Sequence, residues 1–390
     1  MEQKMTVGVV GTGTMGAGIA QVAAQAGHVT WLFDSRPGAA EQAATGLRAT
    51  LEKLVAKGKY TAEQAAAIAE RLRPARAIQD LASCGLVIEA IVEDLAVKRR
   101  VFAELEQHVS ADAVLATNTS SLPVTAIAAG VQRPERVIGL HFFNPAPLMP
   151  LVEVVPGLAT SAERVHNATA WMKDWGKAPV VCKDTPGFIV NRVARPYYGE
   201  SLRLFEEGVA DMATIDAALK QYGGFRMGPF ELMDLIGNDI NFTVTRTVWE
   251  AFFHDPRYRP SITQQRQMES GRYGRKTGQG FFNYAADAPA VNAPDVPDAL
   301  GRSIVERVLA MLINEAADAV FWQVASAADI DLAMTKGVNY PKGLLAWADE
   351  LGAGHWLGVL ERLQSFYGDD RYRPSPLLRS VAERSGRLLS

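Results

Sequence analysis

The sequence predicts an α/β domain followed by an all-α domain that is present in two tandem copies. Short β-rich runs alternate with helical stretches over the first 185 residues, and helical apolar spacing replaces them after Pro186-Gly187. The helical part also repeats itself at a spacing of 115 residues. We therefore expect a sheet domain over 1–185 with an inserted helical hairpin, a first helical copy over 186–284, a linker over 285–297 and a second helical copy over 298–390.

The composition is that of an ordinary globular protein, with 48% apolar and 21% charged residues. The chain carries 40 Lys and Arg against 43 Asp and Glu, so its net charge of -3 provides no general attraction to nucleic acid or to an anionic membrane. Cys84 and Cys182 stand far apart, outside any disulfide or metal-binding pattern. With no signal peptide and no membrane-spanning run, we expect a cytoplasmic protein without a metal, a nucleic-acid partner or a membrane partner.

Seven short runs predict the strands of the sheet, at 6–10, 29–33, 86–91, 113–117, 137–141, 151–155 and 178–183. Helical stretches such as 95–109 and 162–175 separate them, which favours a parallel sheet covered by helices. The connection after Asp34 is unusually long. Its Ala-rich and charge-rich sequence breaks near Gly58 and Thr61, and so predicts the inserted helical hairpin.

The internal repeat links the two helical copies residue by residue. Arg192, Glu200, Asp216, Gly228 and Asp234 return as Arg307, Glu315, Asp331, Gly343 and Asp349, and the motif Arg-Tyr-Arg-Pro-Ser at 257–261 recurs at 371–375. Two copies are too few for a solenoid, so they indicate a duplicated domain. We expect either a monomer with an internal pseudo-dimer or a homodimer.

The motif Gly11-Thr12-Gly13-Thr14-Met15-Gly16 follows the first strand and opens a helix predicted over 17–26. In this context the glycines form a Rossmann-type dinucleotide fingerprint, with the pyrophosphate on the helix N-terminus. Asp34 ends the second strand and favours the ribose diol of NAD over the 2'-phosphate of NADP, although Arg36 leaves that choice open. The alternative is a glycine turn without a ligand.

Glu153 is the one carboxylate in an otherwise apolar strand, and it needs a cation or a donor if it is buried. His141, at the end of the preceding strand, is the candidate partner. A carboxylate behind an imidazole fixes its tautomer and raises its basicity, which suits proton exchange with a substrate. The alternative is a structural histidine beside a solvent-exposed Glu153. Asn118 and Ser120 leave a neighbouring strand at the ligand-binding edge, although both also fit turn and cap positions.

Together these motifs resemble the L-3-hydroxyacyl-CoA dehydrogenase family. The resemblance covers 6–284 and rests on the glycine motif through Ala20, on Glu-Ala-Ile-Val-Glu at 89–93, on 118–121, on His-Phe-Phe-Asn-Pro at 141–145 and on 184–192. It implies NAD-dependent, reversible oxidation of an L-3-hydroxyacyl-CoA to the 3-oxoacyl-CoA, in fatty acid or phenylacetate-type acyl-CoA catabolism. The second helical copy is similar to that of longer bacterial members.

The resemblance also implies the roles of the site residues. His141 would be the general base and Glu153 its orienting partner, while Ser120, Asn144 and Asn191 would hold the substrate. The cofactor would be held by Gly11, Gly13, Thr14, Met15, Gly16, Asp34, Glu93, Lys98 and Asn118. Glu306 replaces Asn191 in the second copy, so we expect a single active site.

Two features stay open. Lys53 and Lys57, four residues apart in the inserted hairpin, either bind CoA phosphates or form a solvated charged face. Arg226 stands where the family commonly has proline, and it either pairs with a distal carboxylate of the acyl chain or is a surface arginine. For the whole chain, the alternatives are an NAD-dependent dehydrogenase of a free 3-hydroxy acid, similar to gulonate dehydrogenase and lambda-crystallin, and a non-catalytic NAD-binding protein.

Overall fold

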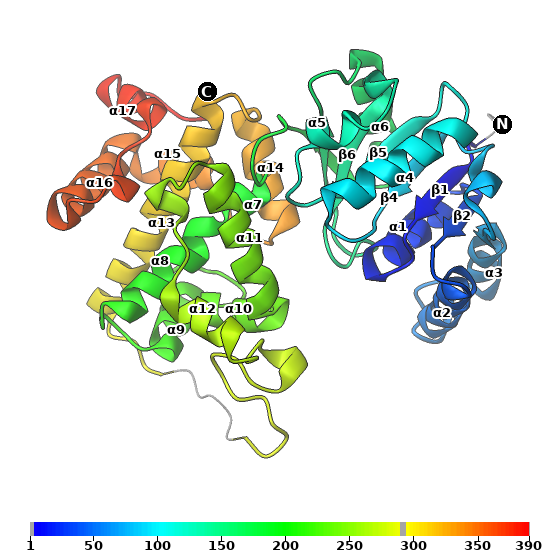
Figure 1. Ribbon diagram of the computed structural model, residues 1–390. Helices are drawn as coiled ribbons and strands as arrows, with labels where there is room; N and C mark the ends of the chain where they lie inside the picture. Colours follow the sequence, from blue (N-terminus) through cyan, green and yellow to red (C-terminus); the bar gives the residue numbers. More distant parts are fainter. Residues whose placement is uncertain (1–3, 289–293, 390) are drawn as a thin grey trace. The chain divides into compact units, whose positions relative to one another are not determined.

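The computed structural model describes residues 4–288 and 294–389, and the chain divides into two compact units, Met1–Thr185 and Pro186–Ser390 (Figure 1). Residues 289–293 of the expected linker lie outside the described residues. Among the helices of the described ranges, none has the length and apolar character needed to cross a membrane.

The first unit is a Rossmann-type α/β domain built on one eight-stranded sheet of order β3-β2-β1-β4-β5-β6-β7-β8. Its strands are β1 (Val7–Val10), β2 (Thr30–Phe33), β3 (Leu72–Pro74), β4 (Leu86–Glu89), β5 (Val114–Thr117), β6 (Val137–Phe142), β7 (Leu151–Pro156) and β8 (Ala178–Val181). β1 lies between β2 and β4, so the strand order reverses there. Open sheets of this kind bind ligands outside the carboxyl ends of the strands next to that reversal.

The predicted parallel sheet is wrong at β7, which runs antiparallel to β6, whereas β8 runs parallel to β7. Residues 143–150 join β6 to β7, and this connection is too short for the crossover that parallel strands need. The prediction also missed β3, because three residues that include Arg73 and Pro74 carry no apolar run.

The helical elements of the first unit are α1 (Thr14–Gln25), α2 (Ala39–Ala56), α3 (Ala62–Arg71), η1 (Ile78–Leu81), α4 (Leu95–His108), α5 (Val124–Ala128), η2 (Pro134–Arg136) and α6 (Ala162–Asp174). α2 and α3 contact each other as a hairpin. The Thr61 hydroxyl accepts from the backbone N–H of Gln64, whose side chain accepts from the Thr61 N–H, and this capping box starts α3.

The second unit is mostly helical. Its first part contains α7 (Val190–Val193), α8 (Arg195–Glu206), α9 (Met212–Gln221), α10 (Pro229–Ile236), α11 (Asn238–Ala251), η3 (Pro256–Tyr258), α12 (Ile262–Glu269) and η4 (Arg275–Thr277). The rest contains α13 (Asp298–Phe321), α14 (Ala327–Gly337), α15 (Leu344–Leu351), α16 (Ala353–Tyr367), η5 (Asp370–Tyr372) and α17 (Pro376–Glu383). α13 is buried without interruption from Arg307 to Ala319 and contacts α8, α9, α15, α16 and α17. A helix that is buried on all sides lies in the interior of its unit, so α13 is the core of this unit.

Candidate active site

His141 and Glu153 lie on neighbouring antiparallel strands and face each other in register. The Nδ1 atom of His141 is 2.6 Å from Oε2 of Glu153, and both side chains are buried. The burial of Glu153 excludes the alternative in which it points into solvent. With its proton on Nδ1, directed at Glu153, the neutral ring carries its lone pair on Nε2, which is the arrangement that a general base requires.

The turn after β5 is held by Glu93. One carboxylate oxygen of Glu93 accepts from the Thr119 hydroxyl at 2.6 Å, from the Ser120 N–H at 3.0 Å and from the Ser121 N–H at 3.1 Å. Burial alone would raise the pKa of Glu93, but the Lys98 charge and these donors hold it below its usual value. Asn118 accepts from the backbone N–H of Phe142 at 2.9 Å, which fixes this turn against the strand of His141.

Glu89 is a site residue that the sequence reasoning did not single out. It is fully buried, and its carboxylate contacts Lys98 Nζ at 2.6 Å and the Thr117 hydroxyl at 2.8 Å. Lys98, itself buried, also lies 3.2 Å from Glu93. The structure thus places Lys98 between the carboxylates of Glu89, the last residue of β4, and Glu93, in the loop after β4. The available signal was an acidic residue at the end of an apolar strand, which resembles the acidic residue inside an apolar strand that identified Glu153.

The glycine motif forms the turn from β1 into α1. Gly11 has a φ of +92°, and a Cβ on Gly16 would come within 1.8 Å of the Gly11 carbonyl oxygen. Gly13 is the N-cap of α1. It has no side chain that could cap the helix, and the space where its Cβ would be is open. The first turn of α1, which begins with Thr14 and Met15, holds no acidic residue. These features fit a pyrophosphate on the N-terminus of α1.

Asp34 lies directly after β2, at the same carboxyl-terminal edge of the sheet as the glycine motif. Its Oδ2 accepts from the Thr12 N–H and hydroxyl at 2.9 and 2.8 Å, and Arg36 contacts its Oδ1 through Nε at 3.2 Å. Partial burial would raise the pKa of Asp34, but these donors hold it well below its usual value. The carboxylate is therefore ionised near neutral pH, and its fixed negative charge would oppose a 2'-phosphate at this edge of the sheet.

The other expected site residues differ in where they lie. Ser120 belongs to the turn held by Glu93, and Asn144 is exposed just after β6. Asn191 lies on α7 in the second unit. Lys53 and Lys57 are exposed at the end of α2, and Arg226 is exposed in the loop before α10. In the described ranges, no group of three or more His, Cys, Asp or Glu side chains is arranged to hold a metal ion.

Comparison with known families gives two matches that together cover most of the chain. The NAD binding domain of 3-hydroxyacyl-CoA dehydrogenase matches residues 6–185. The C-terminal domain of 3-hydroxyacyl-CoA dehydrogenase matches twice, at 187–284 and 304–388.

Individual relatives agree with these matches. The 3-hydroxyadipyl-CoA dehydrogenase of Escherichia coli is 42% identical over 97% of this chain and 97% of its own length. The mitochondrial hydroxyacyl-coenzyme A dehydrogenase of Sus scrofa is 41% identical over 71% of this chain and 90% of its own. A crystal structure of a 3-hydroxybutyryl-CoA dehydrogenase from Escherichia coli superposes with a TM-score of 0.93, at 42% identity, over 98% of this chain and 99% of that one.

Proposed function

The chain belongs to the 3-hydroxyacyl-CoA dehydrogenase family, and we propose that it interconverts an L-3-hydroxyacyl-CoA and the 3-oxoacyl-CoA with NAD. The contact between His141 and Glu153 carries this proposal, because it supplies a buried base with a fixed tautomer beside a dinucleotide-binding edge. The names of the relatives support a CoA thioester as substrate. The reaction would belong to fatty acid or phenylacetate-type acyl-CoA catabolism.

Oxidation of the substrate removes a hydride from C3 and a proton from the 3-hydroxyl group. Bound NAD supplies the acceptor for the hydride. His141 takes the proton at Nε2, since its Nδ1 is held by Glu153. The negative charge of Glu153 stabilises the imidazolium that forms. In the reverse direction the protonated ring returns the proton to the oxygen on C3.

The neighbouring residues position the reactants. We propose that Ser120 binds the oxygen on C3, with Asn144 and Asn191 holding the rest of the reacting end. Lys98 and Glu93 would act near the nicotinamide ribose, Glu93 also by fixing the turn that carries Ser120. Gly13, Thr14 and Met15 would receive the pyrophosphate at the start of α1.

The test is turnover of acetoacetyl-CoA with NADH, compared with free acetoacetate at the same concentration. The proposed function predicts efficient oxidation of NADH with the thioester and little with the free acid. Preference for the free acid would instead support a dehydrogenase of the gulonate or lambda-crystallin type. Binding of NADH without turnover of either compound would leave a non-catalytic NAD-binding protein.

We also propose that the helical unit is a tandem duplication, with boundaries at 186–284 and 298–390. The second match of the C-terminal domain supports this, and so does a repeated cap. The Asp216 carboxylate accepts the N–H groups of Phe230 and Glu231, both at 2.9 Å, and starts α10. Asp331 does the same for α15, accepting from Leu345 at 2.8 Å and from Ala346 at 2.9 Å.

The two copies exchange ion pairs reciprocally, which supports an internal pseudo-dimer. Arg192 contacts Glu315 at 2.5 Å, and their counterparts Arg307 and Glu200 are 2.6 Å apart. Tyr258 donates to Glu315 and Tyr372 donates to Glu200. A two-fold interface has this pattern, because a contact from one residue to a second residue of the other copy is matched by the same contact in the opposite direction. We propose that the chain is a monomer whose second copy takes the place of a partner subunit.

We propose a cytoplasmic location as well. Cys84 is a buried free thiol, which suits a reducing compartment.

A further inference from the structure

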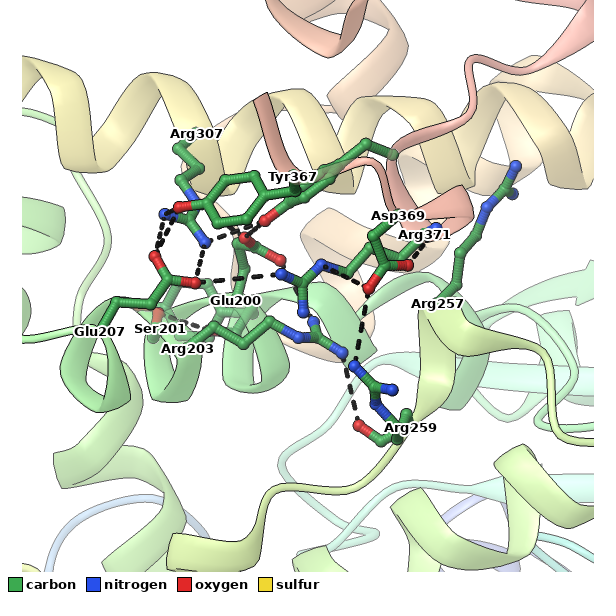
Figure 2. A network of polar contacts seen from close by, with 12 residues as sticks. Glu200, Ser201, Arg203, Glu207, Arg257, Arg259, Arg307, Tyr367, Asp369 and Arg371 are labelled. Atoms are coloured by element: carbon green, nitrogen blue, oxygen red, sulfur yellow. Dashed lines mark hydrogen bonds and ion pairs between the residues drawn. The ribbon is translucent and has the colours of Figure 1, made fainter. Parts of the chain in front are cut away.

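Seven arginines are buried among the residues that the structure describes: Arg136, Arg192, Arg195, Arg203, Arg257, Arg307 and Arg371. Six of them lie within 4.0 Å of a carboxylate. Figure 2 shows several of these pairs, with Arg203, Arg307 and Arg371 around Glu200, Glu207 and Asp369. Arg195 is the exception, because no carboxylate in the described ranges forms an ion pair with it.

Hydroxyl and aromatic groups surround Arg195 instead. Its Nη1 donates to the Thr245 hydroxyl at 3.1 Å, and its guanidinium lies 4.8 Å from the centre of the Tyr198 ring. Its Nε is buried and has no hydrogen-bond partner within the described part of the chain, and the same holds for the hydroxyl of Tyr340. The Tyr340 ring lies 5.8 Å from the Tyr197 ring, which is itself 5.8 Å from the Tyr198 ring that Arg195 contacts, so Tyr340 belongs to the same aromatic cluster.

An unpaired buried cation is costly, and burial lowers the pKa of Arg195 accordingly. An incoming carboxylate would remove that cost. It could accept from Nε of Arg195 and from the Tyr340 hydroxyl, two donors that have no acceptor among the described residues. As a whole residue, Arg195 keeps 7% of its surface accessible, so the described part of the chain does not enclose it completely.

Arg195 also lies at the right position along the chain for a substrate tail. It follows Asn191 by four residues, and Ala194 between α7 and α8 keeps right-handed helical angles, so both side chains project from one face about one turn apart. One helical turn rises about 5.4 Å. In a 3-hydroxyadipyl chain the distal carboxylate lies about 4–5 Å from C3, because three carbon–carbon bonds of roughly 1.5 Å separate them.

We propose that Arg195, with the Tyr340 hydroxyl, binds the distal carboxylate of a dicarboxylic acyl-CoA and so selects substrates of about adipyl length. This inference rests on the proposed function, in which Asn191 contacts the reacting end of the acyl chain. It also gives the second helical copy a direct part in specificity, because Tyr340 follows α14 in that copy. The exposed Arg226 is not needed for the selection.

The experiment compares kcat/KM for 3-hydroxyadipyl-CoA and 3-hydroxyhexanoyl-CoA, two six-carbon chains that differ in the terminal carboxylate. The variants are Arg195→Met, Arg195→Lys and Tyr340→Phe, with Arg226→Met as the matched control. We expect the unaltered enzyme to favour the adipyl substrate. Arg195→Met should lower adipyl kcat/KM about a hundredfold, chiefly through KM, and leave hexanoyl kcat/KM within about threefold. Arg195→Lys and Tyr340→Phe should give smaller losses, confined to the adipyl substrate.

Equal losses for both substrates in Arg195→Met would overturn the inference, because a purely structural arginine behaves in that way. So would a selective loss in Arg226→Met. If Arg195→Met does not fold, two other measurements still test the inference. A preference of the unaltered enzyme for the hexanoyl substrate would contradict it. So would a ratio of adipyl to hexanoyl kcat/KM that is unchanged in Tyr340→Phe. Failure to oxidise either substrate would contradict the proposed function itself, so the two failures can be told apart.

Discussion

His141 and Glu153 stand opposite each other across β6 and β7, with Nδ1 and Oε2 2.6 Å apart. The antiparallel pairing of these strands creates the contact, because directly opposite residues project to the same face of a sheet. The Glu153 carboxylate is fully buried, so it requires a hydrogen-bond donor or a cation as a partner. Strand register and burial together therefore fix the orientation of the imidazole.

Glu153→Gln should lower kcat about a hundredfold while the KM for NADH stays nearly unchanged. The amide can still contact Nδ1, but it lacks the negative charge that stabilises the imidazolium. Steady-state kinetics with acetoacetyl-CoA measure the effect, with Glu163→Gln on the exposed side of α6 as the control. A variant with a normal kcat would show that the charge of Glu153 has no part in the reaction.

Asp34→Ala should narrow the preference for NAD over NADP. The donors around Asp34 keep its pKa well below the usual value, so its charge is constant near neutral pH and opposes the 2'-phosphate. The kcat/KM for the two cofactors gives the measurement, and Arg36→Ala serves as the comparison variant. Equal values for both cofactors in the unaltered enzyme would mean that Arg36 decides the choice instead.

Glu200→Ala and Glu315→Ala should each destabilise the second unit by about 3–5 kcal/mol, since each removes a buried carboxylate that two buried arginines contact. Urea unfolding followed by circular dichroism measures the loss. Glu361→Ala, which breaks the exposed pair with Arg379, should cost less than about 1 kcal/mol. Very different costs at positions 200 and 315 would contradict the reciprocal interface.

The same network makes the second unit sensitive to acid. Burial raises the pKa of Glu200, but the charges of Arg203 and Arg307 outweigh it, so the pKa in the folded state is below the unfolded value of 4.5. The ionised Glu200 carboxylate therefore makes its full contribution to the free energy of unfolding above about pH 4.5. That contribution is lost as the pH falls through the pKa of the folded state. The free energy of unfolding of Glu200→Ala should accordingly fall less steeply below that pH than that of the unaltered protein. Parallel slopes would contradict this origin of the acid sensitivity.

Lys53→Glu with Lys57→Glu should raise the KM for acetoacetyl-CoA several-fold at low salt and leave kcat unchanged, if these exposed lysines bind CoA phosphates. The effect should disappear with a pantetheine thioester, which lacks the nucleotide phosphates. Lys173→Glu, at the end of α6, is the control. An unchanged KM would assign the two lysines to a solvated charged face.

The sequence predicts much of the site because its signals are local. A lone acid in an apolar strand indicated Glu153, and a glycine motif between strand and helix indicated the nucleotide cradle. The direction of β7 was predictable too, since residues 143–150 are too few for a crossover. Arg195 could not be found in this way. Its unusual feature is the lack of a counter-charge, which depends on burial and on side chains from α11 and from the segment after α14.

The most direct test of the proposed function is the turnover number of His141→Ala with acetoacetyl-CoA and NADH, measured beside NADH binding by fluorescence. A general base and acid contributes about a hundredfold or more, so kcat should fall by at least that factor while the affinity for NADH is retained. His166→Ala, on α6, should leave both values unchanged. A kcat for His141→Ala close to that of the unaltered enzyme would contradict the assignment of His141 as the base.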